Sequence, residues 1–147
     1  MPKPRILLDT NILVSGLVFR RGNEHKIVRM VEEGGVTLVL PDPVVDEARG
    51  VFAEKFGGLE GLLEMFLDKA RPEAEAVPMD RLLSAVGRFE GEVRDKKDTA
   101  IYAAVQVAVP DYAVTGDRVL REDLLRSKAA RGTKIVASKE FLKRLKG

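Results

Sequence analysis

The stretch Arg5-Ile-Leu-Leu-Asp-Thr-Asn11 decides the fold class of this chain. Residues 5–8 form a short apolar run without polar alternation, which is typical of a parallel strand buried on both faces. The run ends abruptly at Asp9, and no structural need for an acidic side chain is apparent directly after a buried strand. The stretch therefore predicts a central parallel strand with a functional carboxylate at its end.

Further strands and helices alternate along the remaining sequence. We expect strands at residues 36–40, 75–77, 112–115 and 134–137. We expect helices at about 24–33, 43–56, 59–70, 80–93, 98–109 and 118–125, and a last one from residue 138. Asp42 and Asp80 are expected to cap two of these helices. This alternation implies right-handed crossovers around a parallel sheet, so the prediction is one α/β domain over residues 1–147.

The composition excludes several kinds of chemistry. The 25 Lys and Arg against 23 Asp and Glu give a net charge of +2, far from the basic excess of a protein that coats nucleic acid. The chain has no Cys and one His, which excludes disulfides, a thiolate nucleophile, a Cys-ligated zinc and a multi-His metal site within one chain. General acid/base or metal chemistry must therefore fall to carboxylates.

The sequence also indicates a location and a source. No apolar run approaches the ~20 residues of a membrane span. No charged-then-apolar signal begins the chain, so we expect a cytoplasmic protein with no membrane partner. Only two Asn and one Gln stand beside abundant Arg, Glu and Val, a composition that indicates a thermophilic source.

Four carboxylates stand out by their positions relative to the predicted elements. Asp9 and Asp117 follow predicted strands, and Glu47 lies in the opening turns of the helix that begins at Pro43. These three are expected at one edge of the sheet, outside the carboxyl ends of the strands, where open α/β sheets bind ligands. Asp98 begins a helix that follows another helix, so the pattern alone does not place it at this edge.

The positions of these acids leave two interpretations open. In the first interpretation, Asp98 and Asp117 simply cap the helices that they precede. Glu47 is a separate case, because it falls at the margin of an apolar helix face, where a carboxylate needs a partner. Alternatively, carboxylates that lie close together raise one another's pKa, and a divalent cation removes this repulsion. An all-oxygen site suits Mg²⁺ or Mn²⁺, ions that polarise phosphoryl oxygens and activate water.

Several blocks of the sequence resemble those of PIN-domain ribonucleases. The blocks are Leu7-Leu-Asp-Thr-Asn-Ile-Leu-Val-Ser15, Asp95-Lys-Lys-Asp98 and Tyr112-Ala-Val-Thr-Gly-Asp-Arg-Val-Leu120. The helix over residues 41–56 matches the one that carries the second acid of the family, and residues 134–142 match the final strand and helix. The blocks keep their order over essentially the whole chain.

The resemblance implies a three-layer α/β/α sandwich around a central parallel sheet, with Mg²⁺- or Mn²⁺-dependent cleavage of single-stranded RNA. Its metal-binding acids would be Asp9, Glu47, Asp98 and Asp117. Its supporting residues would be Asn11 and Thr115, with Asp95 as a possible further acid.

Basic residues beside these blocks are candidates for contacts with phosphate groups. They are Arg20, Arg21, Lys26, Arg118 and Arg121. The sequence departs from the family pattern at Lys96 and Lys97, which replace uncharged residues. These two lysines could guide a phosphate group or face solvent, and we favour solvent. The single His25, which has no obvious acid/base partner, is expected to have a surface or packing role.

The resemblance also implies partners and leaves alternatives. The family includes toxins of toxin–antitoxin pairs, so a cognate antitoxin protein and a homodimer are expected beside the RNA substrate. A stand-alone RNA-processing nuclease, or a PIN-like module that only binds RNA or a partner, is the alternative. An aspartyl-phosphate phosphatase is disfavoured, because Asn11 occupies the position where that class needs a second Asp.

Overall fold

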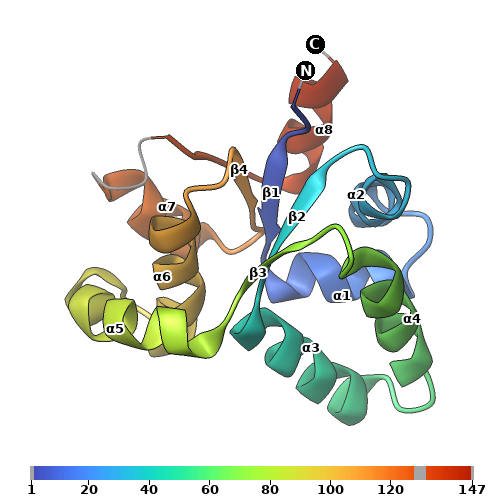
Figure 1. Ribbon diagram of the computed structural model, residues 1–147, viewed down its shortest axis with the longest axis horizontal. Coiled ribbons are helices and arrows are strands. Elements are labelled where there is room, and N and C mark those ends of the chain that lie inside the picture. Colours follow the sequence, from blue (N-terminus) through green and yellow to red (C-terminus); the bar gives the residue numbers. More distant parts are fainter. Residues whose placement is uncertain (1, 128–131, 147) are drawn as a thin grey trace.

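The computed structural model describes residues 2–127 and 132–146 (Figure 1). Within these residues, five parallel strands form one sheet in the order β3-β2-β1-β4-β5. The strands are β1 (Arg5–Leu8), β2 (Thr37–Pro41), β3 (Glu75–Val77), β4 (Tyr112–Val114) and β5 (Lys134–Val136). The predicted parallel sheet is confirmed, including its short strand at residues 75–77.

The helices fall close to their predicted ranges, with one exception. They are α1 (Thr10–Val18), α2 (Asn23–Glu32), α3 (Asp42–Lys55), α4 (Glu60–Ala70), α5 (Met79–Phe89), α6 (Thr99–Ala108), α7 (Arg118–Arg126) and α8 (Ser138–Lys146). The 3-10 turns η1 (Glu90–Glu92) and η2 (Lys96–Asp98) connect α5 to α6.

The exception is α1, which the sequence analysis did not predict. Its buried residues are Thr10, Ile12, Leu13, Val14 and Gly16, so the helix is apolar on most sides. A helix that is covered nearly all round has no amphipathic period to reveal it in the sequence.

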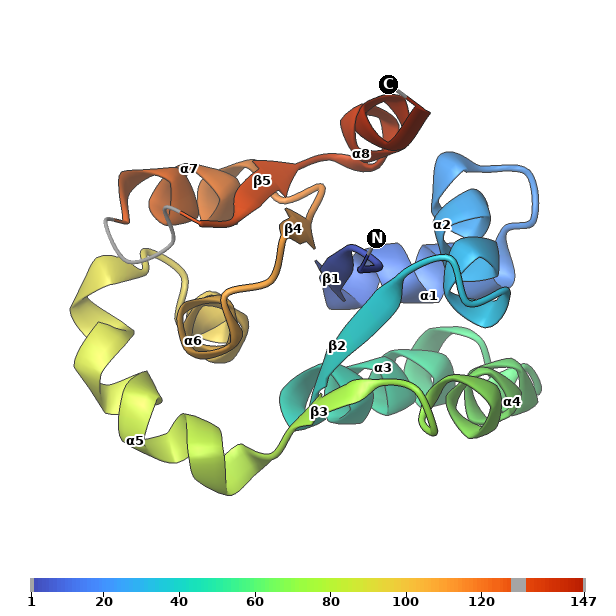
Figure 2. The same cartoon turned by 45° about the horizontal axis from the view of Figure 1, so that its top comes forward.

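The helices cover both faces of the sheet. On one face, α1 packs against α2 and α4, and α2 packs against α8 (Figure 2). On the other face, α5 packs against α6, and α7 lies beside β5. Helix α3 contacts α1 and α4 and reaches α6. This arrangement confirms the predicted three-layer α/β/α sandwich.

Strand β1 is the centre of the sheet and of the core. Leu7 pairs with Val39 of β2 on one side and with Ala113 of β4 on the other. Ile6, Leu7 and Leu8 are at most 2% exposed, as expected for a strand covered on both faces. Full burial of each such side chain contributes roughly 1.5–3 kcal/mol, so β1 is a rigid platform for the residues that follow it.

The predicted capping roles of Asp42 and Asp80 are wrong. Helix α3 begins at Asp42 itself, and the Asp42 carboxylate accepts a hydrogen bond of 3.0 Å from the backbone N–H of Met79, the first residue of α5. Pro41 pairs with Val77, so α3 and α5 begin side by side and Asp42 serves the neighbouring helix. Asp80 lies inside the first turn of α5.

Helix α5 is also shorter than predicted. It ends at Phe89 rather than near residue 93, because the chain tightens there into η1. The Phe89 ring packs edge-on against Tyr102 of α6, with ring centroids 5.7 Å apart. This contact fixes the point at which the chain turns toward the residues that precede α6.

Among residues 2–127 and 132–146, no helix has both the length and the apolar character needed to cross a membrane.

Candidate active site

Two of the predicted acids lie at the ends of paired strands. In the β1–β4 pair, Leu8 lies opposite Val114, and the backbone N–H of Asp9 donates to the Val114 carbonyl oxygen at 3.0 Å. Asp9 follows β1 directly, and Asp117 lies three residues after the end of β4. Because both strands end at the same edge of the sheet, the structure brings Asp9 and Asp117 together, as the pattern predicts.

Thr115 links these two acids. Its hydroxyl donates a hydrogen bond of 2.7 Å to Asp9 Oδ2 and accepts one of 3.0 Å from the backbone N–H of Asp117. The residue is 2% exposed, so water does not compete for the hydroxyl. Thr115 therefore fixes one oxygen of Asp9 relative to the backbone at Asp117.

Asp9 has a structural role that the sequence analysis did not see. Its Oδ1 accepts a hydrogen bond of 2.8 Å from the backbone N–H of Thr10, at the start of the unpredicted helix α1. Burial raises the pKa of Asp9, and the nearby charge of Asp117 adds to this effect, while the bonds from Thr115 and Thr10 oppose it. The surroundings of Asp9 thus disfavour its ionised form.

Asp98 has the largest shift in pKa among the acids of the site. Burial comes first in raising its pKa to about 6, followed by the charges of Asp117, Asp95, Asp9 and Glu47. All five acids therefore share one electrostatic environment. The question that the sequence left open is answered: Asp98 lies with the strand-end acids.

Capping does not explain Asp98. Although it stands at the start of α6, its side chain makes no capping hydrogen bond, and Oδ2 is buried without a partner among the described residues. A buried carboxylate oxygen without a hydrogen bond costs about 1–3 kcal/mol or more. Its position is therefore unfavourable unless a ligand satisfies it.

Helix capping accounts for one carboxylate oxygen of Asp117 and one of Asp95. Asp117 Oδ1 accepts a hydrogen bond of 3.0 Å from the N–H of Leu120 at the start of α7. Asp95 Oδ1 accepts one of 3.0 Å from the N–H of Lys97 at the start of η2. In the part of the chain that the structure describes, the second oxygen of each acid makes no hydrogen bond, so each acid keeps one oxygen for a ligand.

Glu47 and Asn11 lie at the margin of the site. Glu47 is exposed on α3 and, against the expectation of a partner, makes no hydrogen bond or ion pair with any described residue. Its charge nevertheless contributes to raising the pKa of Asp98. Asn11 is exposed in the first turn of α1, and its amide contacts none of the acids through a hydrogen bond within the described residues.

The chemistry of these side chains fits a divalent cation. Within residues 2–127 and 132–146, no three Asp, Glu, His or Cys side chains are already close enough to hold an ion together. The donors are nevertheless all carboxylate oxygens, which suit hard cations such as Mg²⁺ or Mn²⁺. The unpartnered Oδ2 of Asp98 and the mutual repulsion are both relieved by a bound cation.

An open groove of about 590 Å³ runs beside the acids. Arg94, Asp95, Lys96, Asp117 and Val119 line it. Lys96 thus lies at the groove, whereas its exposed neighbour Lys97 does not line it. Both lysines are exposed, as expected, and Lys96 faces this open groove.

The predicted phosphate contacts fall into two groups. Arg118 and Arg121 belong to α7, next to Asp117, and Arg118 forms an ion pair of 3.2 Å with Glu122. Of the second group, Arg20 and Arg21 follow the far end of α1, which is roughly 13 Å long at 1.5 Å per helical residue, and Lys26 lies in the first turn of α2. The structure therefore brings only the first group to the acids, and the role of each residue stays a prediction.

His25 has a packing role, as predicted. Its Nδ1 lies 2.8 Å from the carbonyl oxygen of Gly16, so the ring links α2 to α1.

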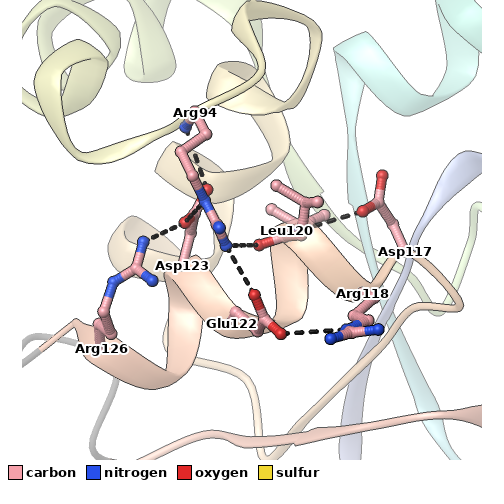
Figure 3. A network of polar contacts seen from close by, with 8 residues as sticks. Arg94, Asp117, Arg118, Leu120, Glu122, Asp123 and Arg126 are labelled. Atoms are coloured by element: carbon pink, nitrogen blue, oxygen red, sulfur yellow. Dashed lines mark hydrogen bonds and ion pairs between the residues drawn. The ribbon is translucent and has the colours of Figure 1, made fainter.

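Sequence reasoning missed two residues beside the site, Arg94 and Asp123. The side chain of Asp123 in α7 is fully buried and forms an ion pair of 2.8 Å with Arg94, which precedes Asp95 (Figure 3). One signal was present in the sequence: Asp123 shares a helix face with the buried Leu120 and Leu124. The partner of such a carboxylate cannot be found from spacing, because Arg94 lies 29 residues away.

Comparison with known proteins identifies the family. The sequence model of the PIN domain matches residues 5–119 of the chain. The chain therefore belongs to the PIN-domain family, whose members are generally nucleases, and the predicted resemblance is confirmed. No curated protein matches the sequence.

A solved structure shares the fold. It is that of VapBC2 from Rickettsia felis bound to a DNA fragment from the VapBC2 promoter. The two chains superpose with a TM-score of 0.64 at 15% sequence identity, over 90% of this chain and 96% of the other. This similarity supports the same arrangement of sheet and helices at a low level of sequence identity.

Proposed function

We propose that this chain is a Mg²⁺- or Mn²⁺-dependent endoribonuclease that cleaves single-stranded RNA. One observation carries the proposal: Asp98 has a buried, unpartnered Oδ2 among four further acids whose charges disfavour its ionised form. A bound divalent cation would relieve both effects at once. Membership of a family of nucleases supports a phosphodiester as the bond that is cleaved.

Asp9, Asp98 and Asp117 would hold the ion, with Glu47 and Asp95 at its margin. When bound, Mg²⁺ or Mn²⁺ supplies Lewis-acid polarisation of a phosphoryl oxygen and lowers the pKa of water. Thr115 orients Asp9 by donating to its Oδ2. The N–H of Leu120 orients Asp117 through Oδ1. We expect in-line attack of water on phosphorus, which leaves a 5′-phosphate and a 3′-hydroxyl.

The RNA backbone would follow the groove beside Asp95 and Asp117. Lys96 lines this groove and offers a cation to a phosphate group next to the scissile one. A bound metal ion and Lys96 together reverse the negative charge of the acids, so the net charge of +2 is compatible with binding a few phosphates.

The fold also supports a role as the toxin of a toxin–antitoxin pair. The structurally similar VapBC2 chain belongs to such a complex, and we expect an antitoxin protein that covers the acidic edge. Expression of the chain alone should arrest growth of the host, and co-expression with the product of an adjacent small gene should relieve the arrest. Undisturbed growth would leave a stand-alone RNA-processing nuclease as the function.

The first test replaces Asp9 by Asn. Asn caps helices about as well as Asp, so D9N keeps the start of α1 but loses the charge. We expect cleavage of single-stranded RNA by the wild-type chain to be abolished by EDTA and restored by Mn²⁺. D9N should fold, as its circular dichroism spectrum will show, and should be inactive. Full activity of D9N, or of wild type in EDTA, contradicts the proposal, and RNA binding without cleavage supports a binding module.

The second test uses the two adjacent lysines. Replacing Lys96 by Ala should raise KM for RNA about tenfold, in keeping with loss of 1–2 kcal/mol of phosphate binding, with little change in kcat. Lys97→Ala is the matched control, because Lys97 is equally basic but does not line the groove. Equal KM values for the two variants would show that the groove does not bind the RNA backbone.

A further inference from the structure

A network of ion pairs joins the segment before α6 to helix α7. Arg94 donates from its backbone N–H to Asp123 Oδ2 at 3.1 Å and from Nε to Asp123 Oδ1 at 2.8 Å (Figure 3). The Asp123 side chain is fully buried, whereas that of Arg94 is 48% exposed. Both oxygens of a buried carboxylate are thus bound to the same residue of another segment.

The same guanidinium reaches two further points on α7. Its terminal nitrogen donates to the carbonyl oxygen of Val119 at 3.2 Å and to Glu122 Oε1 at 3.0 Å. Glu122 in turn accepts a bond of 3.2 Å from Arg118. A single side chain therefore fixes both the position and the rotation of the first two turns of α7.

The two segments joined in this way carry three of the acids of the site, Asp95 and Asp98 on one and Asp117 on the other. Arg94 directly precedes Asp95 and lies four residues before Asp98. Helix α7 begins immediately after Asp117, which caps it. The contact between Arg94 and Asp123 therefore sets the distance between the Asp95–Asp98 segment and Asp117.

We propose that Arg94 is a positioning residue that sets the spacing of the metal-binding carboxylates through Asp123. This inference rests on the proposed function, since it assigns the metal affinity of the site to a contact outside it. Residues that hold ligands in place typically change metal affinity 10- to 100-fold when they are replaced. Because the Asp123 carboxylate is fully buried, loss of the Arg94 guanidinium also lowers global stability, so the test measures metal affinity and stability separately.

The chain provides a matched control in Arg126. Arg126 also forms an ion pair with Asp123 Oδ1, but it belongs to the same helix, three residues further on. Replacing Arg126 by Ala removes a cation from Asp123 without releasing one segment from the other. Conversely, Arg94→Ala removes the guanidinium bonds to α7 but keeps the backbone N–H bond to Asp123 Oδ2 and the ion pair of Asp123 with Arg126. The buried carboxylate therefore keeps a compensating charge, and the variant is expected to fold.

The experiment measures Mn²⁺ binding to metal-free full-length protein by calorimetry, and single-turnover cleavage of RNA at saturating Mn²⁺. We expect Arg94→Ala to weaken Mn²⁺ binding at least tenfold and Arg126→Ala to change it less than about twofold. Arg94→Lys keeps the charge but lacks the planar fork with which Arg94 binds Asp123 through Nε and Glu122 through a terminal nitrogen. Its Mn²⁺ affinity should therefore lie between those of wild type and Arg94→Ala. Because Arg94 also lines the groove, KM for RNA is measured separately, and the Mn²⁺ affinity of RNA-free protein is the readout that decides the role of Arg94.

The outcomes separate this inference from the proposed function. If wild type binds no Mn²⁺ and cleaves no RNA, the proposed function is wrong. If wild type does both, and Arg94→Ala matches Arg126→Ala in Mn²⁺ affinity, Arg94 has only a structural role. A lower melting temperature of Arg94→Ala with wild-type Mn²⁺ affinity would likewise overturn the positioning role.

Discussion

Three aspartates that precede helices are used in different ways. Asp9 and Asp117 each give one oxygen to the start of a helix, whereas Asp98 gives none. Residue type and position are the same in all three cases, so the sequence could not separate capping from ligand binding. The difference arises from neighbours: Thr115 satisfies Asp9, and the charges of the other acids act on Asp98.

Thr115 is the residue whose replacement best tests this local arrangement. Thr115→Val keeps the shape but removes the donor to Asp9 and the acceptor for the Asp117 N–H. We expect the free energy of unfolding to fall by about 1–3 kcal/mol, because both groups lose a buried hydrogen bond. Mn²⁺ affinity should fall roughly tenfold, as measured by calorimetry.

Thr115→Ser provides the control, since it retains the hydroxyl. Chemical denaturation should show Ser to be close to wild type and Val to be well below it. Equal stability and equal Mn²⁺ affinity of the two variants would show that the hydroxyl does not organise the acids.

At the scale of elements, the close approach of α1 and α2 supports the edge of the sheet. A Cβ atom on Gly16 would lie 2.5 Å from Val28 Cγ2 and 2.6 Å from the Glu24 carbonyl oxygen. The two helices therefore pack closer than any side chain at this position would allow. Since Asp9 caps α1, a shift of α1 also moves one of the acids.

Gly16→Ala should consequently be destabilising. The overlap with the backbone of α2 forces the helices apart, and we expect a loss of about 1–3 kcal/mol in the free energy of unfolding. Gly50→Ala is the matched control, because Gly50 lies in α3 and a Cβ atom added there would have no other atom within 4 Å. This substitution should raise the free energy of unfolding by about 0.5–1 kcal/mol. Chemical denaturation measures both, and a neutral Gly16→Ala would contradict the tight contact.

At the scale of the whole molecule, the acids couple stability to pH. Asp98 in the folded protein has a pKa of about 6, above its ordinary value of 3.8, and the pKa of Asp9 is shifted in the same direction. At these two acids the folded state therefore binds more protons than the unfolded state between about pH 4 and 6. Their contribution to stability falls as pH rises through this window and stays reduced above it.

We expect the melting temperature of metal-free protein to be higher at pH 5 than at pH 7.5. Adding Mn²⁺ should raise it at pH 7.5 more than at pH 5, because protons compete with the cation for the same oxygens. Differential scanning calorimetry measures both effects. Solvent screening around the partly exposed Asp98 reduces their size but not their sign.

Asp98→Asn isolates the contribution of this residue. The variant should be more stable than wild type at pH 7.5 without metal, should lose most of the difference between the two pH values, and should respond weakly to Mn²⁺. A wild-type pH dependence in Asp98→Asn would mean that other groups govern it.

The sequence by itself determined the sheet, the order of its elements and the family of the chain. Short apolar runs such as residues 5–8, and acids directly after strands, can be recognised from the sequence alone because they involve only neighbouring residues.

Tertiary structure decided the rest. Helix α1 was missed because burial on most sides removes its amphipathic period. Asp42 accepts a hydrogen bond from Met79 of α5 because the pairing of Pro41 with Val77 places the two helix starts side by side. The convergence of Asp98 with Asp9, and the pairing of Arg94 with Asp123, join residues far apart in the chain. Such contacts depend on how elements pack, and no local pattern encodes them.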